Sequence, residues 1–250
     1  MIPKQRQDKI LALLKEYQYC KYTFLSKQLF VSTATVRRDA RELESRGLLR
    51  LVLNGVSPVI EPKDLAADYS VSVNLDKKRQ LAKYAKSIIR NGMSLFIDSS
   101  STCLVFMREL TDIDNLYIVT NGLMEATECI SHPNWHVSLI GGEMNKTLRN
   151  IGGPKGIQDI NNYHADISIF SCRGLIEQGA SDANENEAFL KRAFVDNSDK
   201  SLLLVDSSKI NKHNLYIGAR MNDLNYIATD YPLPNPLAKE AIKNKITILN

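Results

Sequence analysis

Apolar residues in the first 50 positions recur at helical spacing in three successive segments. A first helix is predicted over about residues 4–17, and a second from a Thr23 cap to about Leu29. The third begins after Ser32, a good N-cap, and ends at Gly47, which tolerates the left-handed conformation. The few residues between the last two helices match the turn of a helix-turn-helix unit. The apolar residues predicted to face inward are Ile10, Leu13, Leu14, Tyr17, Leu25, Leu29, Val36, Ala40 and Leu43.

After Gly47 the pattern changes to a β-rich run that is broken by Asn54-Gly55, the strongest short signal for a hairpin turn. Three helices followed by a hairpin predict a winged helix-turn-helix over residues 1–57. The hairpin forms the wing, which would lie beside phosphates or the minor groove of DNA. Arg50 is the basic residue of the wing that we expect to contact DNA.

The third helix has two unlike faces. One is a narrow apolar stripe, and the other carries hydroxyl and guanidinium groups. Arginine pairs bidentately with guanine, and threonine bonds to base edges or phosphates, so this face suits a major groove. A solvated surface helix would carry the same charges, and the helix alone leaves that alternative open. The candidate DNA-binding residues are Ser32, Thr33, Thr35, Arg37, Arg38, Arg41 and Arg50.

The positive charge of the chain is concentrated near its amino-terminal end. Residues 1–60 hold 11 Lys and Arg against 5 Asp and Glu, a net charge of +6, whereas the other residues have a net charge of −2. A basic segment joined to a nearly neutral one is typical of a nucleic-acid-binding module with a partner domain. A membrane-surface role fits the charge equally well, but it does not fit three capped helices without a strongly apolar face.

Length and composition narrow the class of protein. A chain of 250 residues is too long for the basic module alone, so we expect domains over 1–57 and 77–250 with a linker over 58–76. No run approaches the ~20 apolar residues that span a bilayer, and no secretory signal is recognised, so a cytoplasmic location without a membrane partner is predicted. The four cysteines and four histidines lack metal-ligand spacing, so we expect free thiols, no metal and no cofactor.

From residue 77 onwards, helices alternate with short apolar strands. Short, fully apolar strands between helices predict an α/β domain with a mostly parallel sheet that is covered on both faces. The predicted helices are residues 77–91, 101–110, a segment ending near 130, 186–197 and 236–244. The predicted strands are residues 94–98, 116–120, 136–140, 165–170, 201–205, 226–229 and 246–249.

Polar side chains follow several of these strands, at the edge where parallel sheets bind ligands. The first strand runs through Asp98 and a series of hydroxyl residues into a helix, whose free amide groups suit a phosphate. Helix caps and glycine turns would explain each fragment singly, but several fragments at one edge favour a ligand site. The candidates are Asp98, Ser99, Ser100, Ser101, Thr102, Thr120, Asn121, Gly141, Gly142, Glu187, Lys191, Asp206 and Lys209.

Two sets of motifs carry a resemblance to a known family. The first is Val31-Ser-x-x-Thr35-Val-Arg37-Arg38-Asp39, followed by Leu43-Glu44 and Gly47-Leu48-Leu49. The second is Asp98-Ser-Ser-Ser-Thr102, Thr120-Asn121, Gly141-Gly142, Glu187-x-x-x-Lys191-Arg192 and Asp206-Ser-Ser-Lys209. With these motifs the chain resembles the DeoR-type transcriptional repressors of bacterial sugar metabolism over nearly its whole length.

The resemblance implies a carboxyl-terminal domain similar to ribose-phosphate isomerase and its relatives, with a phosphorylated sugar as effector. The loop from Asp98 to Thr102 would take the phosphate, and the sugar hydroxyls would face Glu187, Lys191, Asp206 and Lys209. Family members assemble as dimers or tetramers on repeated half-sites. The implied partners are therefore a double-stranded DNA operator, a phosphorylated sugar and further copies of the chain in a homodimer or homotetramer.

The chain departs from the family pattern at two places. Ser100 stands where the family has glycine, and its Cβ would narrow the approach of a phosphate or change the pose of the ligand. The wing has Leu53-Asn54-Gly55 in place of a His-Gly-Gly turn, which puts the minor-groove contact in doubt. Asp39, within the third helix, is interpreted as the partner of a nearby arginine that stabilises the fold, rather than as a base reader.

The predicted function is a sequence-specific transcriptional regulator, a repressor of a sugar catabolism or uptake operon, and not an enzyme. The alternative is a sugar-phosphate isomerase-like enzyme with an appended DNA-binding module, because Glu187, Asp206 and Lys209 offer a general base and a polarising lysine. A third class, a DNA-binding domain fused to a protein-interaction module, is disfavoured by the polar strand ends.

Overall fold

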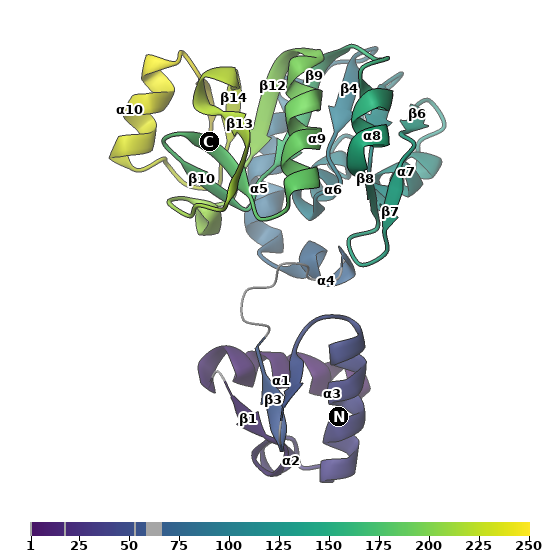
Figure 1. Ribbon diagram of the computed structural model, residues 1–250, viewed down its shortest axis with the longest axis vertical. Helices are drawn as coiled ribbons and strands as arrows, with labels where there is room; N and C mark the ends of the chain where they lie inside the picture. The colour runs from purple at the N-terminus through teal and green to yellow at the C-terminus, as the bar shows by residue number, and fades with distance from the viewer. Residues whose placement is uncertain (1, 18, 53, 59–66) are drawn as a thin grey trace. The chain divides into compact units, whose positions relative to one another are not determined.

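A computed structural model describes residues 2–17, 19–52, 54–58 and 67–250 of the chain. The chain divides into two compact units, Met1–Ser70 and Val71–Asn250 (Figure 1). Of the segment predicted as a linker, residues 59–66 lie outside the described residues. The described part of that segment contains helix α4 (Ala67–Ser72) and the first residues of α5 (Leu75–Lys86), so much of it is helical.

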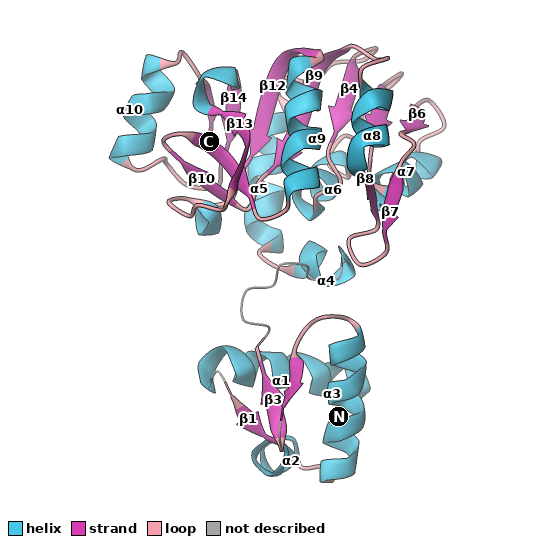
Figure 2. Ribbon diagram, viewed as in Figure 1, coloured by secondary structure: helices cyan, strands magenta, loops and turns pink. Residues whose placement is uncertain are grey.

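The amino-terminal unit contains three helices and a small antiparallel sheet (Figure 2), which confirms the winged helix-turn-helix. Its elements are α1 (Pro3–Tyr17), β1 (Cys20–Lys21), α2 (Tyr22–Leu29), α3 (Thr33–Ser45), β2 (Arg50–Val52) and β3 (Gly55–Ser57). Ile10, Leu25 and Val36 are completely buried, as their spacing predicts. Tyr17 is different, since it is 52% exposed and its ring meets Phe24 edge-on.

The ends of α3 are confirmed, whereas the predicted start of α2 is wrong. The Ser32 hydroxyl accepts a hydrogen bond from the Thr35 amide at 3.2 Å, and Gly47 follows the helix at φ 68°. Thr23 lies inside α2, and the capping position belongs to Lys21, whose side chain makes no capping bond. The helix forms without a side-chain cap because its buried apolar residues hold it in place.

The hairpin predicted at Asn54-Gly55 is confirmed, but the two residues have different roles. Asn54 lies in the turn at φ 61°, in the left-handed region that asparagine tolerates. Gly55 is already part of β3, where it pairs with Lys21 of β1. A Cβ atom on Gly55 would lie 2.4 Å from the carbonyl oxygen of Cys20, so glycine is required here by close approach of two strands. Residue 53 lies outside the described residues.

The second unit is built on a seven-stranded parallel sheet in the order β15-β14-β12-β9-β4-β5-β6 (Figures 1 and 2). All seven strands predicted from the sequence are present. They are β4 (Ser94–Ile97), β5 (Tyr117–Thr120), β6 (His136–Leu139), β9 (Ala165–Ser171), β12 (Ser198–Leu204), β14 (Tyr226–Ala228) and β15 (Thr247–Leu249). Because all strands run in one direction, their carboxyl ends meet at one edge.

Successive side chains of the central strands enter different cores on the two faces of the sheet. Leu95 and Ile97 of β4 pack with residues of α5 and α6, whereas Phe96 packs with α8 and α9. The rings of Phe96 and Phe194 are stacked, with centroids 4.9 Å apart. The helices that follow α5 are α6 (Ser101–Met107), α7 (Leu123–Glu128), α8 (Gly153–Ile160), α9 (Glu185–Asp196) and α10 (Asn235–Lys243).

Several elements differ from the sequence prediction. The helices expected over 77–91 and 101–110 end earlier, at Lys86 and Met107, and short turns complete both segments. The hairpin of β7 (Glu143–Asn145) and β8 (Asn150–Gly152) and helix α8 were not predicted. A second antiparallel sheet, also not predicted, contains β10 (Gly174–Ile176), β11 (Gly179–Asp182) and β13 (Tyr216–Arg220). In the described part of the chain, no helix has the length and apolarity needed to cross a bilayer.

Candidate functional site

Helix α3 presents its basic residues to solvent. Arg37, Arg38 and Arg41 are all exposed, and within the described residues no ion pair engages Arg38 or Arg41. The guanidinium carbon of Arg37 lies 5.1 Å from the centre of the Tyr22 ring, a cation–π contact that orients it. Arg50 is exposed on β2. The predicted face of hydroxyls and arginines is therefore present and accessible.

The hydroxyl groups at the start of α3 are partly occupied by the helix itself. The Ser32 hydroxyl caps the helix and lies 3.0 Å from the Thr35 hydroxyl, so these two groups form one unit. One of the two hydroxyls donates to the other, so one proton of the pair is left to donate to a further acceptor. Thr33, the first residue of α3, is exposed.

Asp39 is buried and forms a two-bond ion pair with Arg6 of α1. Arg6 Nε lies 2.7 Å from one carboxylate oxygen, and Nη2 lies 3.1 Å from the other. This geometry joins α1 to α3 and satisfies both oxygens of the carboxylate. The interpretation of Asp39 as a residue that stabilises the fold is confirmed, and its arginine comes from a helix 33 positions away in sequence.

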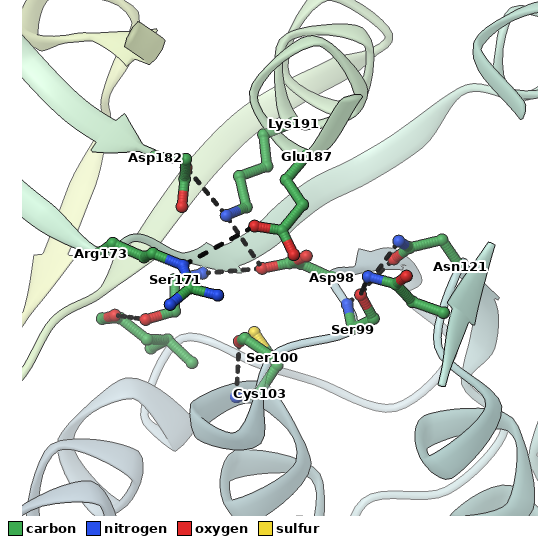
Figure 3. A network of polar contacts seen from close by, with 12 residues as sticks. Asp98, Ser99, Ser100, Cys103, Asn121, Ser171, Arg173, Asp182, Glu187 and Lys191 are labelled. Atoms are coloured by element: carbon green, nitrogen blue, oxygen red, sulfur yellow. Dashed lines mark hydrogen bonds and ion pairs between the residues drawn. The ribbon is translucent and has the colours of Figure 1, made fainter. Parts of the chain in front are cut away.

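In the second unit, charged side chains from the end of β4, from β11 and from α9 meet at the carboxyl edge of the sheet (Figure 3). Lys191 Nζ of α9 lies 2.9 Å from Asp182 and 3.8 Å from Asp98, and all three side chains are buried. Burial alone would lower the pKa of Lys191, but the surrounding carboxylates, with Asp182 first, raise it. Burial raises the pKa of Asp98 and of Glu187. Arg173 Nε lies 4.0 Å from Glu187, so one lysine and one arginine face three carboxylates.

A second group of charges lies around the loop that follows β12. Lys209 Nζ donates to the Ser171 hydroxyl at 2.9 Å and lies 3.9 Å from Asp206. Lys78 of α5 is buried and donates to the Ser101 hydroxyl at 2.9 Å. Burial, followed by repulsion from Lys209, lowers the pKa of Lys78 to about 8. Two ammonium groups that repel each other across a set of hydroxyls are suited to a bound anion.

Hydrogen bonds from one neutral and one charged side chain hold the start of α5 to the loop that follows β12. Asn74 donates to the Ser208 hydroxyl at 3.0 Å, and Lys77 donates to the Ser207 hydroxyl at 2.7 Å. Ser207 is in turn fixed by the Asp230 carboxylate, which accepts from the Ser207 amide and hydroxyl. The loop after β12 is therefore rigidly positioned against the start of α5.

Ser99, in the loop after β4, is bonded to residues at the ends of other strands. Its amide donates to Asn121 at 2.9 Å, and its hydroxyl accepts from the amide groups of Asn121 and Asn150 at 3.0 Å each. A pocket of about 230 Å³ opens beside these two asparagines. Its other walls are the β7–β8 hairpin and the start of α9, including Glu187.

Some predicted site residues have structural roles in this arrangement. Thr120 is completely buried, and its hydroxyl donates to Ile97 and accepts from Gly122. The Gly141 amide is bonded to Asp159, and Gly142 has φ 149°, where a Cβ atom would lie 2.6 Å from the Gly152 carbonyl oxygen. Ser100 caps α6 by accepting from the Cys103 amide. These contacts account for the four residues without a ligand.

Four buried polar atoms lack a hydrogen-bond partner of good geometry among the described residues. They are the hydroxyl of Thr102, both carboxylate oxygens of Asp182 and one oxygen of Asp206. Buried polar atoms in native proteins are nearly always satisfied, and those that remain open gather where a ligand or water completes them. Thr102 lies in the first turn of α6 and Asp206 in the loop after β12, whereas Asp182 is the last residue of β11 and has Lys191 Nζ 2.9 Å away.

Sequence reasoning missed several residues of this cluster. Lys78 lies in a regular helix, where a lysine is expected at the surface. Asp182, Arg173 and Asn150 belong to short strands and loops that the apolar pattern did not reveal. A signal for Asp182 was available, since it opens the run Asp182-Ala-Asn184 directly before the helix that carries Glu187 and Lys191.

An exposed arginine helix on a winged unit, joined to an α/β unit with an open charged cluster, defines a DNA-binding transcriptional regulator with a sensor domain. Two family models match the chain: a DeoR-like helix-turn-helix domain over residues 6–61 and a DeoR C terminal sensor domain over residues 73–231. The chain belongs to the DeoR family of transcriptional regulators.

Relatives of similar length are named as regulators. The HTH-type transcriptional regulator GolR of Listeria innocua is 29% identical over 96% of this chain and 95% of its own. The transcriptional repressor AccR of Agrobacterium fabrum is 30% identical over 91% of this chain and 89% of its own. The L-fucose operon activator of Haemophilus influenzae is 28% identical over 94% of each chain. The alternative of an enzyme with an appended DNA-binding module has no support among these relatives.

Among solved structures, a ribose 5-phosphate isomerase A from Methanocaldococcus jannaschii aligns with 55% of this chain and 55% of its own. The sequence identity is 16% and the TM-score is 0.41. A likeness of this size carries no argument about activity or ligand.

Proposed function

We propose that this regulator is a repressor of an operon for sugar catabolism or uptake, and that a phosphorylated sugar bound in the carboxyl-terminal unit controls its affinity for the operator. The observation that carries the proposal is the pair of ammonium groups on Lys78 and Lys209, which repel each other beside the hydroxyls of Ser101 and Ser171. A phosphate dianion between them would replace repulsion by attraction and accept bonds from the hydroxyls.

The neighbouring groups suit the hydroxyls of a sugar. Asp98, Asp182, Glu187 and Asp206 supply carboxylate oxygens, some of them open in the structure, and a carboxylate is a strong acceptor for a hydroxyl donor. Asn121 is oriented by Ser99 at the mouth of the pocket. We assign the effector to residues 77–250 and DNA recognition to residues 1–57, with Arg37, Arg38, Arg41 and Arg50 as contacts to bases or phosphates.

Repression is favoured because several relatives carry that name, such as the GlcR repressor of Bacillus subtilis and the AccR repressor, although the fucose operon relative is an activator. In the proposed mechanism, the carboxyl-terminal units form a homodimer or homotetramer, which sets the spacing of two recognition helices on repeated half-sites. The effector favours one arrangement of these units, and the helices lose register with the DNA.

The test is operator affinity with and without a panel of sugar phosphates. The operator would first be selected from genomic fragments with the full-length protein, and affinity measured at a fixed salt concentration, because phosphate contacts depend on salt. At least one sugar phosphate is expected to weaken binding by tenfold or more. Affinity that is unchanged across the panel would reject the effector, and tighter binding would assign the opposite regulatory sign.

A further inference from the structure

The pocket beside Ser99 has a lining without a single basic side chain. Its polar side chains are all carboxylates and carboxamides, and four aliphatic or thioether side chains complete it. The lining residues are Asn121, Glu143, Met144, Asn145, Leu148, Asn150, Ile151, Gly152, Gly153, Asn184, Asn186, Glu187 and Leu190. This composition differs sharply from the lysine pair at the other side of the loop, so the two regions suit different parts of a ligand.

Asn145 and Asn184 each have an occupied side-chain oxygen, so their side chains can offer only donors to the pocket. Asn145 Oδ1 accepts from the amides of Thr147 and Leu148, and Asn184 Oδ1 accepts from the amides of two residues in the first turn of α9. Their side-chain NH₂ groups have no hydrogen-bond acceptor among the described residues. Glu143 and Glu187 supply acceptors on the same walls. Donors and strong acceptors together match a hydroxyl, which both donates and accepts.

The pocket and the lysine pair are close enough for one small molecule. Asn121 and Asn150, which line the pocket, both donate to the Ser99 hydroxyl. Lys78 donates to Ser101, two positions further along the chain. Two residues of backbone span at most about 7 Å, which is less than the length of a sugar phosphate.

We propose that the pocket is the subsite for the end of the effector remote from its phosphate, and that it selects an uncharged, hydroxyl-bearing end over one that carries a carboxylate or a second phosphate. The inference rests on the proposed function. An anionic end would meet Glu143 with no cation on the lining to pair with it, and Glu187, whose partner Arg173 lies 4.0 Å away and outside the lining. It would lose its hydration as well. A hydroxyl end meets acceptors and free amide donors at no such cost.

Matched pairs of ligands test the selection directly. An alditol phosphate and the aldonate phosphate of equal chain length differ only in a terminal CH₂OH or carboxylate, as in glucitol 6-phosphate and 6-phosphogluconate. Pairs with four, five and six carbons would be titrated calorimetrically into the full-length protein at constant pH and salt. In every pair that binds, we expect the alditol phosphate to bind at least tenfold more tightly than the aldonate phosphate.

Two variants assign the selection to the pocket. Glu143→Gln keeps the shape and removes one charge from the lining, so it is expected to narrow the ratio between the two ligands by threefold or more. Glu185→Gln is the matched control, since Glu185 is exposed in the first turn of α9 and lies outside the lining. It is expected to leave the ratio unchanged.

The outcomes separate the subsite from the proposed function. Binding of phosphate-bearing ligands with a ratio near one, or with the aldonate preferred, would overturn the subsite and leave the anion site standing. The same holds if Glu143→Gln and Glu185→Gln change the ratio equally. If neither inorganic phosphate nor any sugar phosphate binds to the wild-type protein, the proposed function itself is rejected.

Discussion

Buried charged side chains are paired differently in the two units. In the amino-terminal unit, Arg6 and Asp39 form a buried pair in which each carboxylate oxygen has its own donor. In the carboxyl-terminal unit, Asp182 and Asp206 are equally buried but have a looser arrangement of cations, since Lys191 lies 2.9 Å from Asp182 and 3.8 Å from Asp98, and Lys209 lies 3.9 Å from Asp206. The first arrangement gives each carboxylate oxygen its own donor, whereas in the second one lysine is shared by several carboxylates.

The exposed charges differ less between the two units. Arg38 and Arg41 of the amino-terminal unit form no ion pair with any described residue, and they stand on the helix that suits a major groove. In the carboxyl-terminal unit, some exposed charges are paired, such as Lys243 with Glu240, whereas others, such as Lys83 and Arg90, form no ion pair with any described residue. The buried charges therefore distinguish the two units: they are paired one to one in the first unit and shared within a cluster in the second.

The largest effect on stability is expected from breaking the buried ion pair between Arg6 and Asp39. Asp39→Asn leaves the buried guanidinium of Arg6 without a countercharge, and an uncompensated buried charge is among the most destabilising changes in a protein. The melting temperature of the amino-terminal unit should fall by roughly 10 °C or more. Thermal unfolding followed by circular dichroism measures it, with Asp8→Asn on the exposed face of α1 as the control.

Ligand binding by the carboxyl-terminal unit shows whether the loss of stability is confined to the amino-terminal unit. Binding of a sugar phosphate to the Asp39→Asn variant should match the wild type. If both variants melt like the wild type, the pair is not a determinant of the fold. If Asp39→Asn also abolishes sugar phosphate binding, the amino-terminal and carboxyl-terminal units do not fold independently of each other.

The exposed arginines of α3 should contribute to operator affinity and not to thermal stability. Arg37→Ala and Arg38→Ala should each lose ~1–3 kcal/mol of operator affinity if the side chain contacts a base, with little change in melting temperature. Fluorescence anisotropy with labelled operator DNA measures the loss. Arg90→Ala, at an exposed site of the second unit, is the control. If both α3 variants bind the operator with near-wild-type affinity, α3 does not lie in the major groove.

Anion binding should depend on the protonation of Lys78. Its pKa of about 8 means that the ammonium is present at pH 7 and increasingly absent above pH 8. A sugar phosphate is already a dianion above pH 7.5, because its second pKa is about 6. Affinity should therefore fall as pH rises from 7.5 to 9.5, by up to about tenfold per pH unit.

Two lysine variants of α5 sharpen this assignment. Lys78→Met should weaken binding at pH 7.5 and flatten the pH profile, whereas Lys83→Met, at an exposed position of the same helix, should preserve the profile. Calorimetric titration at several pH values provides the measurement. A wild-type profile that is flat up to pH 9.5 would contradict the role of Lys78.

The smallest effect is expected from changing the open cluster. Asp182→Asn removes one of three carboxylates around Lys191, so the lysine keeps Asp98 and Glu187 as countercharges and the repulsion between Asp98 and Asp182 is relieved. The free energy of unfolding should change by less than about 1 kcal/mol, in contrast to a closed pair. Urea denaturation measures it. A loss as large as that of Asp39→Asn would mean that this cluster, too, is primarily structural.

Sequence reasoning succeeded where the pattern was local. The caps of α3 and all seven sheet strands follow from short-range spacing, and the hairpin follows from two residues. Asp39 was assigned to an arginine, but the partner helix could not be named because the contact joins positions 33 apart. The strands β7, β8 and β11 were missed because they consist mainly of polar residues and glycine and so lack the apolar run that marks the equally short strands of the large sheet.

Burial explains the remaining omissions. Lys78 and Lys83 both lie in α5 and look alike in sequence, yet one is buried and the other exposed. Only the packing of α5 against the large sheet and α6 distinguishes them. Of the predicted ligand residues, Thr120, Gly141 and Gly142 are accounted for by turns and helix-start contacts, and a pattern of residue types does not separate such roles from recognition.

A sheet in which every strand runs the same way collects loops from positions 98, 121, 171 and 206 at a single edge. Each loop is supplied by a separate strand, and the apolar side chains of the strands pack in the cores on the two faces of the sheet. One loop can therefore be exchanged or lengthened while the framework and the neighbouring loops stay unchanged. An architecture of this kind lets new chemical signals be adopted piece by piece, without redesign of the part that reads DNA.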